Sequence, residues 1–109
     1  MKASLGMFEE EKLKDSRRCS WTVSDREIQG EYLYDHLTNQ RGTYSESTYY
    51  RVMIDRRTSE AAYSRVVCWC DSLAEDNDGR TERIDEAEVP DEAITHLMEA
   101  LKRAGVQWE

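Results

Sequence analysis

The stretch at residues 74–88 carries the side chains of a calcium loop, with seven carboxylates against two arginines. A helix–loop–helix calcium site needs oxygen ligands at loop positions 1, 3, 5 and 12 and a glycine at position 6. If Gly79 is position 6, Asp76 and Asp78 fill positions 3 and 5. Position 1 is then Ala74, which has no side-chain oxygen, and the glutamate of position 12 is missing. The tripeptide Asn-Asp-Gly in this stretch is a hairpin signal, so we predict a hairpin turn there and no calcium site.

Cysteine and histidine supply the other side chains that could bind a metal ion. Cys68 and Cys70 stand two residues apart, so on a strand both thiols point to one face. His36 and His96 could complete such a site only through tertiary packing. We favour the alternative that both cysteines are small buried hydrophobic residues under a helix. With Cys19 they make three cysteines and nothing indicates export, so we predict free thiols in a reducing cytoplasm and no metal or cofactor.

Catalytic signatures are missing from the sequence. It contains no G-x-S-x-G, P-loop, H-E-x-x-H or G-x-G-x-x-G motif. Carboxylates are abundant, but their abundance is a poor indicator of acid–base catalysis. We therefore predict that the protein is not an enzyme. A small-ligand binder or enzyme with a pocket between sheet and helix is the weakest of the alternatives.

The negative charge of the chain is concentrated in one segment. The net charge is −8, which argues against direct binding of nucleic acid. Residues 71–99 hold eleven Asp and Glu against two Arg, while the rest of the chain is nearly neutral. Such a band speeds encounter with a basic protein surface, although a solvated surface is the simpler explanation. The residues that we predict to bind a basic partner protein are Asp76, Asp78, Glu82, Asp85, Glu86, Glu88, Asp91 and Glu92.

A second candidate surface combines aromatic side chains with arginine. Alternation along two predicted strands groups Tyr49 with Arg51, and Tyr63 with Arg65 and Trp69. A helix that covers the Val/Ile/Cys face of the sheet would leave all five exposed on the other face. Tyr, Trp and Arg are enriched at binding hot spots. This surface predicts a homo-oligomer, such as a homodimer, or an accessory subunit; the alternative is cross-strand pairing on a solvated sheet.

These surfaces require a sheet and a helix to position them. Alternating apolar and polar residues predict strands over 18–24, 26–37, 48–56 and 61–71, and a charged edge strand over 80–89. Turns are expected at 38–43 and 56–60, and a bulge at Gly30. The apolar stripe through residues 90–104 predicts a helix that ends at Gly105. A short helix over 4–14 is expected at the N-terminus, with a strand through the same region as the alternative.

Together these elements predict one domain over residues 1–109. The expected fold class is α+β: an antiparallel sheet of four to five strands with the C-terminal helix packed on one face. The sequence has no apolar run of 18 residues and no secretory signal, so we expect no membrane span and a cytoplasmic location.

In size and charge the chain is similar to small acidic inhibitors made by phages and mobile elements, including anti-CRISPR and anti-restriction proteins. This resemblance rests on residues 74–92, AEDNDGRTERIDEAEVPDE, and on the length of the chain. It is a likeness of composition and implies no residue roles. It implies a non-enzymatic, acidic protein-binding module that acts as a nucleic-acid mimic on a basic surface of its partner.

Overall fold

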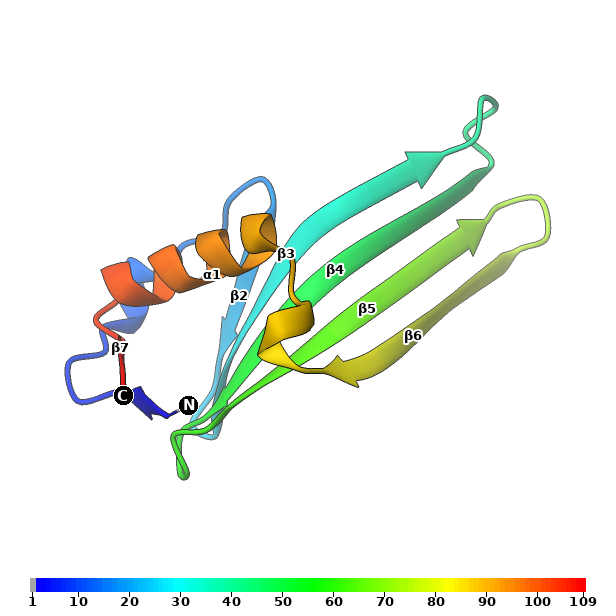
Figure 1. The fold of residues 1–109 in the computed structure, drawn as a ribbon. Coiled ribbons are helices and arrows are strands. Elements are labelled where there is room, and N and C mark those ends of the chain that lie inside the picture. The colour runs from blue at the N-terminus through cyan, green and yellow to red at the C-terminus, as the bar shows by residue number, and fades with distance from the viewer. Residues whose placement is uncertain (1) are drawn as a thin grey trace.

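The protein is described by a computed structural model that covers residues 2–109. Figure 1 shows a long antiparallel sheet with one helix, α1 (Asp91–Arg103), packed across one end of it. The α+β arrangement predicted from the sequence is confirmed. Five strands follow one another across the sheet in chain order: β2 (Cys19–Val23), β3 (Glu27–Thr38), β4 (Tyr44–Asp55), β5 (Ala61–Asp71) and β6 (Asp76–Ile84).

A second, two-stranded sheet joins the two ends of the described chain. In it β1 (Ala3–Ser4) pairs antiparallel with β7 (Gln107–Trp108). A single 3-10 turn, η1 (Glu10–Lys12), follows β1. The predicted helix over 4–14 is therefore wrong, and a strand there spans only two residues. Gly6 interrupts any helical run, and the segment is instead held by tertiary contacts such as the bond from Glu9 N–H to the Ala104 carbonyl (2.7 Å).

Side chains that alternate along the strands divide the large sheet into two faces. We call the face on which α1 packs the helix-side face. Its residues beneath the helix come from all five strands and are fully or nearly buried. They are Cys19, Ile28, Tyr32, Tyr50, Val52, Ile54, Tyr63 and Ile84.

The helix α1 forms where the apolar stripe predicts it. Leu97 and Leu101 are completely buried against the sheet. Gly105 has φ of +97° and ends the helix, after which Val106 returns to the core and is 2% exposed. Among residues 2–109, no helix has the length and apolar character needed to cross a membrane.

The predicted bulge lies at a different residue. Pairing through Gly30 is regular, and the register shift falls between Leu33 and Asp35. Gly30 is required for packing, because a β-carbon there would lie 2.4 Å from the ring of Trp21. The small residue therefore makes room for a large one on the neighbouring strand.

The hairpin between β5 and β6 turns earlier than the Asn-Asp-Gly signal predicts. Residues 72–75 form the turn, and Gly79 lies inside β6. The carboxylate of Asp71 accepts the N–H groups of Leu73 (3.1 Å) and Ala74 (3.2 Å). Glu75 takes the left-handed conformation, with φ of +52°. The turn stabilised by the Asp71 side chain therefore forms in place of a turn at Asn-Asp-Gly. The strand predicted at 80–89 is thus shifted, and a 3-10 turn, η2 (Glu86–Glu88), connects β6 to the helix.

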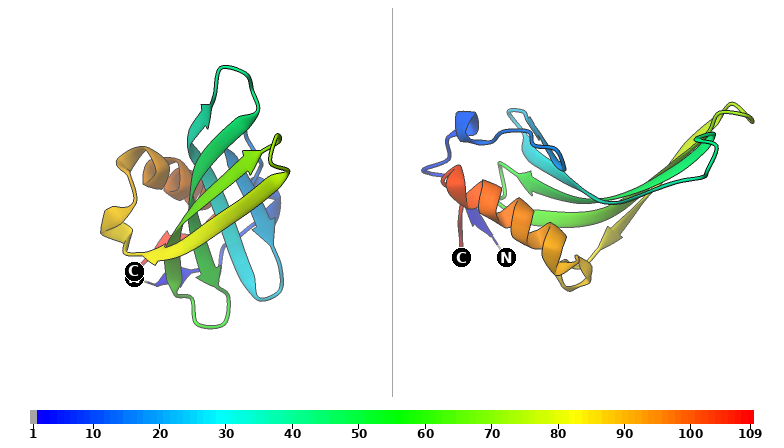
Figure 2. Two further views of the ribbon diagram at one scale, coloured as in Figure 1. Left: turned by 90° about the vertical axis from the view of Figure 1, so that its right-hand side faces the viewer. Right: turned by 90° about the horizontal axis from the view of Figure 1, so that it is seen from above.

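The sheet extends well beyond the helix. Figures 1 and 2 show α1 over one end, while the β3–β4 and β5–β6 hairpins project past it. We call this projecting part the sheet extension and define it as residues 33–38, 44–49, 66–71 and 76–82. No other element of residues 2–109 packs on either face of it in these views. The sheet extension therefore lies outside the contact between α1 and the sheet.

Candidate protein-binding surface

The helix-side face of the sheet extension gathers carboxylates from four strands. Cross-strand pairing places Leu37, Glu46, Trp69 and Asp78 in one row. The next row toward the hairpin tips holds Tyr44, Asp71 and Asp76, and the next row toward the helix holds Asp35, Thr48, Val67 and Arg80. Opposite residues in an antiparallel pair point to the same face. We call this surface the acidic face, since it holds five carboxylates and a single arginine.

Apolar side chains are interspersed with the carboxylates of the acidic face. Leu37 is 57% exposed, and Tyr34 and Tyr44 also keep more than a third of their surface. The ring of Tyr34 packs edge-on against that of Tyr50, with ring centres 5.3 Å apart. Trp69 is partly exposed between Glu46 and Asp78. Exposed aromatic and aliphatic side chains beside charged ones are typical of protein-binding sites.

Two carboxylates of this region already have partners within the chain, and one of the two partners is charged. The guanidinium of Arg65 donates to the carboxylate of Glu82 at 2.6 Å, which lowers the pKa of Glu82 below its usual value. The hydroxyl of Tyr44 donates to Glu46 at 3.1 Å, and this bond raises the pKa of Tyr44. Within residues 2–109, Asp76 takes part in no ion pair, so its charge remains available to a partner.

The eight acidic residues predicted from the sequence follow one path through the structure. All are exposed, and they lie along β6, then η2, then the first turn of α1 (Figure 1). Asp85 and Glu88 form a reciprocal capping box around η2. Their charges therefore also serve the local fold. Glu86 lies close enough to Tyr63, and Glu92 to Tyr32, to raise the pKa of each tyrosine in addition to the larger effect of burial.

Sequence reasoning missed the acidic and apolar residues that β3 and β4 contribute. These are Asp35, Glu46, Leu37 and Tyr44, which lie far from the acidic segment in the chain. The alternation of side chains along β4 places all its even-numbered residues on one face, so the position of Tyr44 and Glu46 could have been predicted from the sequence. Which β3 residues join them depends on the bulge at Leu33–Asp35, and the sequence offers no mark of that irregularity.

The proposed aromatic and arginine surface does not exist as a single face. Tyr49 pairs with Val66 and Arg51 with Ser64, on the side away from the helix. Tyr63, Arg65 and Trp69 lie on the helix-side face, and Tyr63 is buried there. The prediction that these five residues share an exposed face is therefore wrong, because the pairing of β4 with β5 inverts the expected faces of β5.

The opposite face of the sheet extension has no Asp, Glu, Lys or Arg. Its rows hold Leu33, Tyr49, Val66 and Thr81, then His36, Ser47, Cys68 and Gly79, then Thr38, Ser45, Cys70 and Asn77. We call it the uncharged face. His36 hydrogen-bonds there to Ser47 (2.7 Å) and Thr38 (3.1 Å). The two faces of the extension thus differ sharply in charge.

The cysteines Cys68 and Cys70 are exposed on the uncharged face. The expectation that they lie buried under the helix is wrong, because the pairing of β4 with β5 places the even-numbered residues of β5 on the side away from the helix. Within residues 2–109, no group of three His, Cys, Asp or Glu side chains is arranged to hold a metal ion. Cys19 alone is buried, and burial raises the pKa of its thiol.

Thiol labelling should report these positions directly. In the native protein we expect Cys68 and Cys70 to react rapidly with a water-soluble disulfide reagent, because both are exposed. Cys19 should react only after denaturation, since it is buried and its pKa is raised. Mass spectrometry of the labelled peptides identifies each site. Protection of Cys68 and Cys70 in the native state would contradict the assignment of faces.

The titration of Tyr63 tests the same assignment from the other side of the sheet. Burial, with a smaller contribution from Glu86, raises the pKa of Tyr63 to about 12. The pKa of a tyrosine in an unfolded chain is about 10. The stability contributed by the protonated residue is therefore complete below about pH 10 and is lost as the pH rises toward about 12. Denaturant unfolding at a series of pH values should show a shallower alkaline decline for Tyr63→Phe than for the unmodified protein. Parallel declines would show that Tyr63 is not buried.

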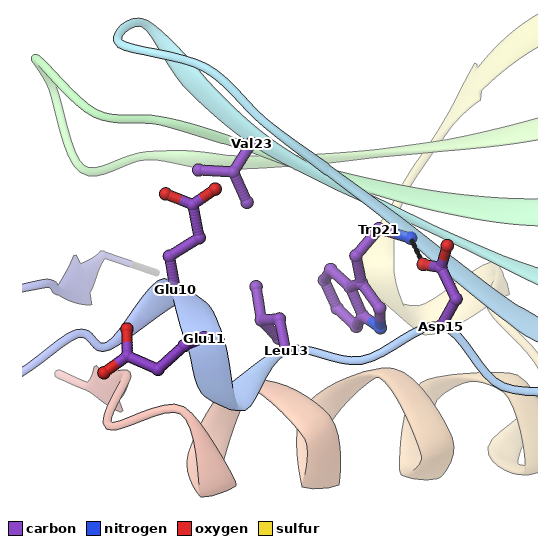
Figure 3. A pocket seen from close by; sticks show the side chains of 6 residues that line it. All are labelled: Glu10, Glu11, Leu13, Asp15, Trp21 and Val23. Carbon is purple, nitrogen blue, oxygen red and sulfur yellow. Dashed lines mark hydrogen bonds between the residues drawn. The ribbon is translucent and has the colours of Figure 1, made fainter.

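A separate hollow lies near the N-terminal segment and is shown in Figure 3. It has a volume of about 340 Å³ and is lined by Glu10, Glu11, Leu13, Asp15, Trp21 and Val23. Leu13 faces the ring of Trp21, whose backbone N–H donates to the Asp15 carboxylate at 2.7 Å (Figure 3). The lining supplies carboxylate acceptors and apolar contact, and none of its residues belongs to the acidic face.

Comparison with models of protein families, with curated proteins and with solved structures found no match to this chain.

Proposed function

We propose that the protein is a non-enzymatic binding module whose acidic face docks on a basic surface of a partner protein. One observation carries this proposal: cross-strand pairing collects carboxylates around exposed apolar side chains on one face of the sheet extension. Acidic side chains accelerate encounter with basic surfaces, and the exposed apolar side chains supply contact area that slows dissociation. In its most concrete form, the module inhibits a nucleic-acid-binding partner by occupying the site that otherwise receives phosphates, as an anti-defence inhibitor would.

Charge reversal at two positions of the acidic face tests this proposal. Asp76→Lys combined with Asp78→Lys should weaken binding to a lysine-rich peptide by at least about tenfold at low salt, mainly through slower association. Rising salt should shrink the difference, since exposed charges are screened. Isothermal titration and stopped-flow fluorescence measure the affinity and the association rate.

The matched control changes the same net charge elsewhere. Glu10→Lys combined with Glu11→Lys alters two exposed carboxylates beside the hollow of Figure 3. This variant should keep most of the affinity of the unmodified protein. If both pairs of reversals weaken binding equally, total charge rather than the acidic face is responsible, and the proposal fails.

A second candidate function is self-association through the uncharged face. The observation that favours it is the absence of Asp, Glu, Lys and Arg from three consecutive rows, which run from Tyr49 and Val66 toward the hairpin tips. Two copies of a chain with net charge −8 approach most easily where neither is charged. Light scattering distinguishes this candidate: a stable dimer that Tyr49→Lys dissociates would favour it over the acidic face.

A further inference from the structure

The strand β6 forms an open edge of the large sheet. It is the last strand in the order, and within residues 2–109 only β5 pairs with it. Its pairing with β5 is regular throughout, and residues 76–83 are all exposed. Figures 1 and 2 show it running along the outer side of the extension. Such an edge presents backbone donors and acceptors that another strand can use.

Two hydrogen bonds show which residues of β6 point their backbone groups outward. The N–H of Ser72, just beyond β5, donates to the Thr43 carbonyl on the β4 side (2.8 Å). The backbone groups of even-numbered residues of β5 therefore point toward β4, and those of odd-numbered residues point toward β6. The N–H of Gly79 donates to the carboxylate of Asp78 (2.7 Å). It therefore does not bond to β5. Backbone groups alternate between the two sides of an antiparallel strand, so the outward-pointing residues are Asn77, Gly79, Thr81 and Arg83.

The side chains of the intervening residues give this edge a charge pattern. Asp76, Asp78, Arg80 and Glu82 point to the helix-side face, in the order negative, negative, positive, negative. An added antiparallel strand places its own alternate side chains directly beside them. A strand with the complementary pattern meets an opposite charge at all four positions, and at three of them the charge has no ion-pair partner within residues 2–109, because only Glu82 is paired, with Arg65. A second copy of β6 aligned about Gly79 matches two positions and opposes two, so charge gives self-pairing no advantage.

We propose, as an extension that rests on the proposed function, that the basic partner contributes an extended segment that adds to β6 as a sixth antiparallel strand. The N–H of Gly79 then donates to the added strand, and the carboxylate of Asp78 turns to a basic side chain of that strand. Strand addition obtains affinity from main-chain hydrogen bonds and specificity from alternate side chains. The partner is thereby defined by chemistry: an extended segment with basic residues at every second position and one acidic residue opposite Arg80.

The other edge of the sheet, formed by β2 and beyond Leu33 by β3, fits such a partner less well. On β2 the N–H groups of Cys19 and Trp21 already donate to Ser16 (3.1 Å) and Asp15 (2.7 Å). Beyond Leu33, β3 no longer pairs with β2, and the bulge at Leu33–Asp35 breaks its regularity. The N–H of His36 is bonded to the Asp35 carboxylate at 2.9 Å. The side chains on its helix-side face are Asp35 and Leu37, which do not continue an alternating charge pattern. Charge complementarity therefore selects β6.

Selective N-methylation of a synthetic peptide tests strand addition. The probe is Lys-Thr-Glu-Thr-Lys-Thr-Lys, whose charged residues oppose Glu82, Arg80, Asp78 and Asp76 in antiparallel alignment. Its Thr N–H groups then point at the outward groups of β6, and its Lys and Glu N–H groups point away. One variant carries N-methyl groups on the three Thr residues, and the control carries them on three of the charged residues. Both variants keep every charge.

The expected result separates the two variants. Methylation at Thr should weaken binding by at least about tenfold, because it removes the donors to β6, while methylation at the charged residues should change it little. Equal affinities for both variants, or no binding of the parent peptide, would overturn strand addition. If the peptides bind equally and Asp76→Lys with Asp78→Lys still weakens them, the acidic face binds basic groups without a new strand. The proposed function then survives and the strand proposal does not.

A substitution in the protein provides a second, independent test. Thr81→Pro removes an N–H that points to solvent, which an edge strand tolerates, and Thr81→Ala is the matched control. We expect both variants to unfold at similar denaturant concentrations, and only the proline variant to lose at least about tenfold in affinity for the parent peptide. Full affinity in a folded Thr81→Pro protein would contradict the use of this edge.

Discussion

Replacing Trp69 with alanine is expected to weaken binding of the partner protein by roughly tenfold to thirtyfold, mainly through faster dissociation. Trp69 lies in the central row of the acidic face, between Glu46 and Asp78. Buried aromatic anchors at the centre of an interface contribute more than the contacts around them. Charge reversal at Asp76 and Asp78, by contrast, acts chiefly on the association rate. The two classes of variant should therefore separate kinetically.

Surface plasmon resonance on a partner recovered from the native host, with the unmodified protein as bait, measures this separation. Tyr49→Ala is the matched control, since Tyr49 is a partly exposed aromatic residue on the uncharged face of the same extension. It should leave both rate constants nearly unchanged. A Trp69→Ala protein that dissociates at the original rate would exclude Trp69 as an anchor. An equal effect of Tyr49→Ala would place the interface on the other face.

Truncation of Leu97 should cost about 2–5 kcal/mol of the free energy of unfolding, whereas truncation of Leu37 should cost less than about 0.5 kcal/mol. Leu97 is completely buried between α1 and the sheet, so Leu97→Ala leaves a cavity. Leu37 is 57% exposed on the acidic face, and its loss removes little buried surface. The same side-chain change thus separates the core beneath the helix from the extension beyond it.

Urea unfolding monitored by circular dichroism measures both free energies. Similar losses for the two variants would mean that Leu37 packs as core, and this apolar side chain would then be unavailable to a partner. Binding supplies the complementary readout. Leu37→Ala should weaken partner binding while leaving the fold intact, a combination that a residue with a purely structural role does not give.

The sequence predicted the elements more successfully than the faces of the sheet. The helix and the five-stranded sheet follow from apolar periodicity, and Gly105 marks the end of the helix as expected. The sequence does not show which face of β5 packs against the helix. Both alternate sets of its residues contain apolar side chains, and one of the adjacent residues Val66 and Val67 belongs to each set. Pairing with β4 through the turn at 56–60 decides the phase, and this is a tertiary property.

The acidic face was predicted in part for the same reason. Residues close together in the chain, such as Asp76 and Asp78, are visible as a charged segment. Asp35 and Glu46 join them only through pairing across three strands. The turn before β6 was displaced because the Asp71 carboxylate bonds to two backbone N–H groups. Local side-chain bonds of this kind compete with turn signals that rest on residue type alone.

Covalent side-chain footprinting of the complex with the partner tests whether the acidic face is the binding surface, because one measurement reads both faces of the sheet extension. Carboxyl, indole and thiol reagents, followed by mass spectrometry, report the labelling of each side chain with and without the partner. We predict that binding protects Asp76, Asp78 and Trp69 while Cys68 and Cys70 remain as reactive as in the free protein. Protection of the two cysteines with unchanged labelling of Asp76, Asp78 and Trp69 would contradict the assignment of the acidic face as the binding surface.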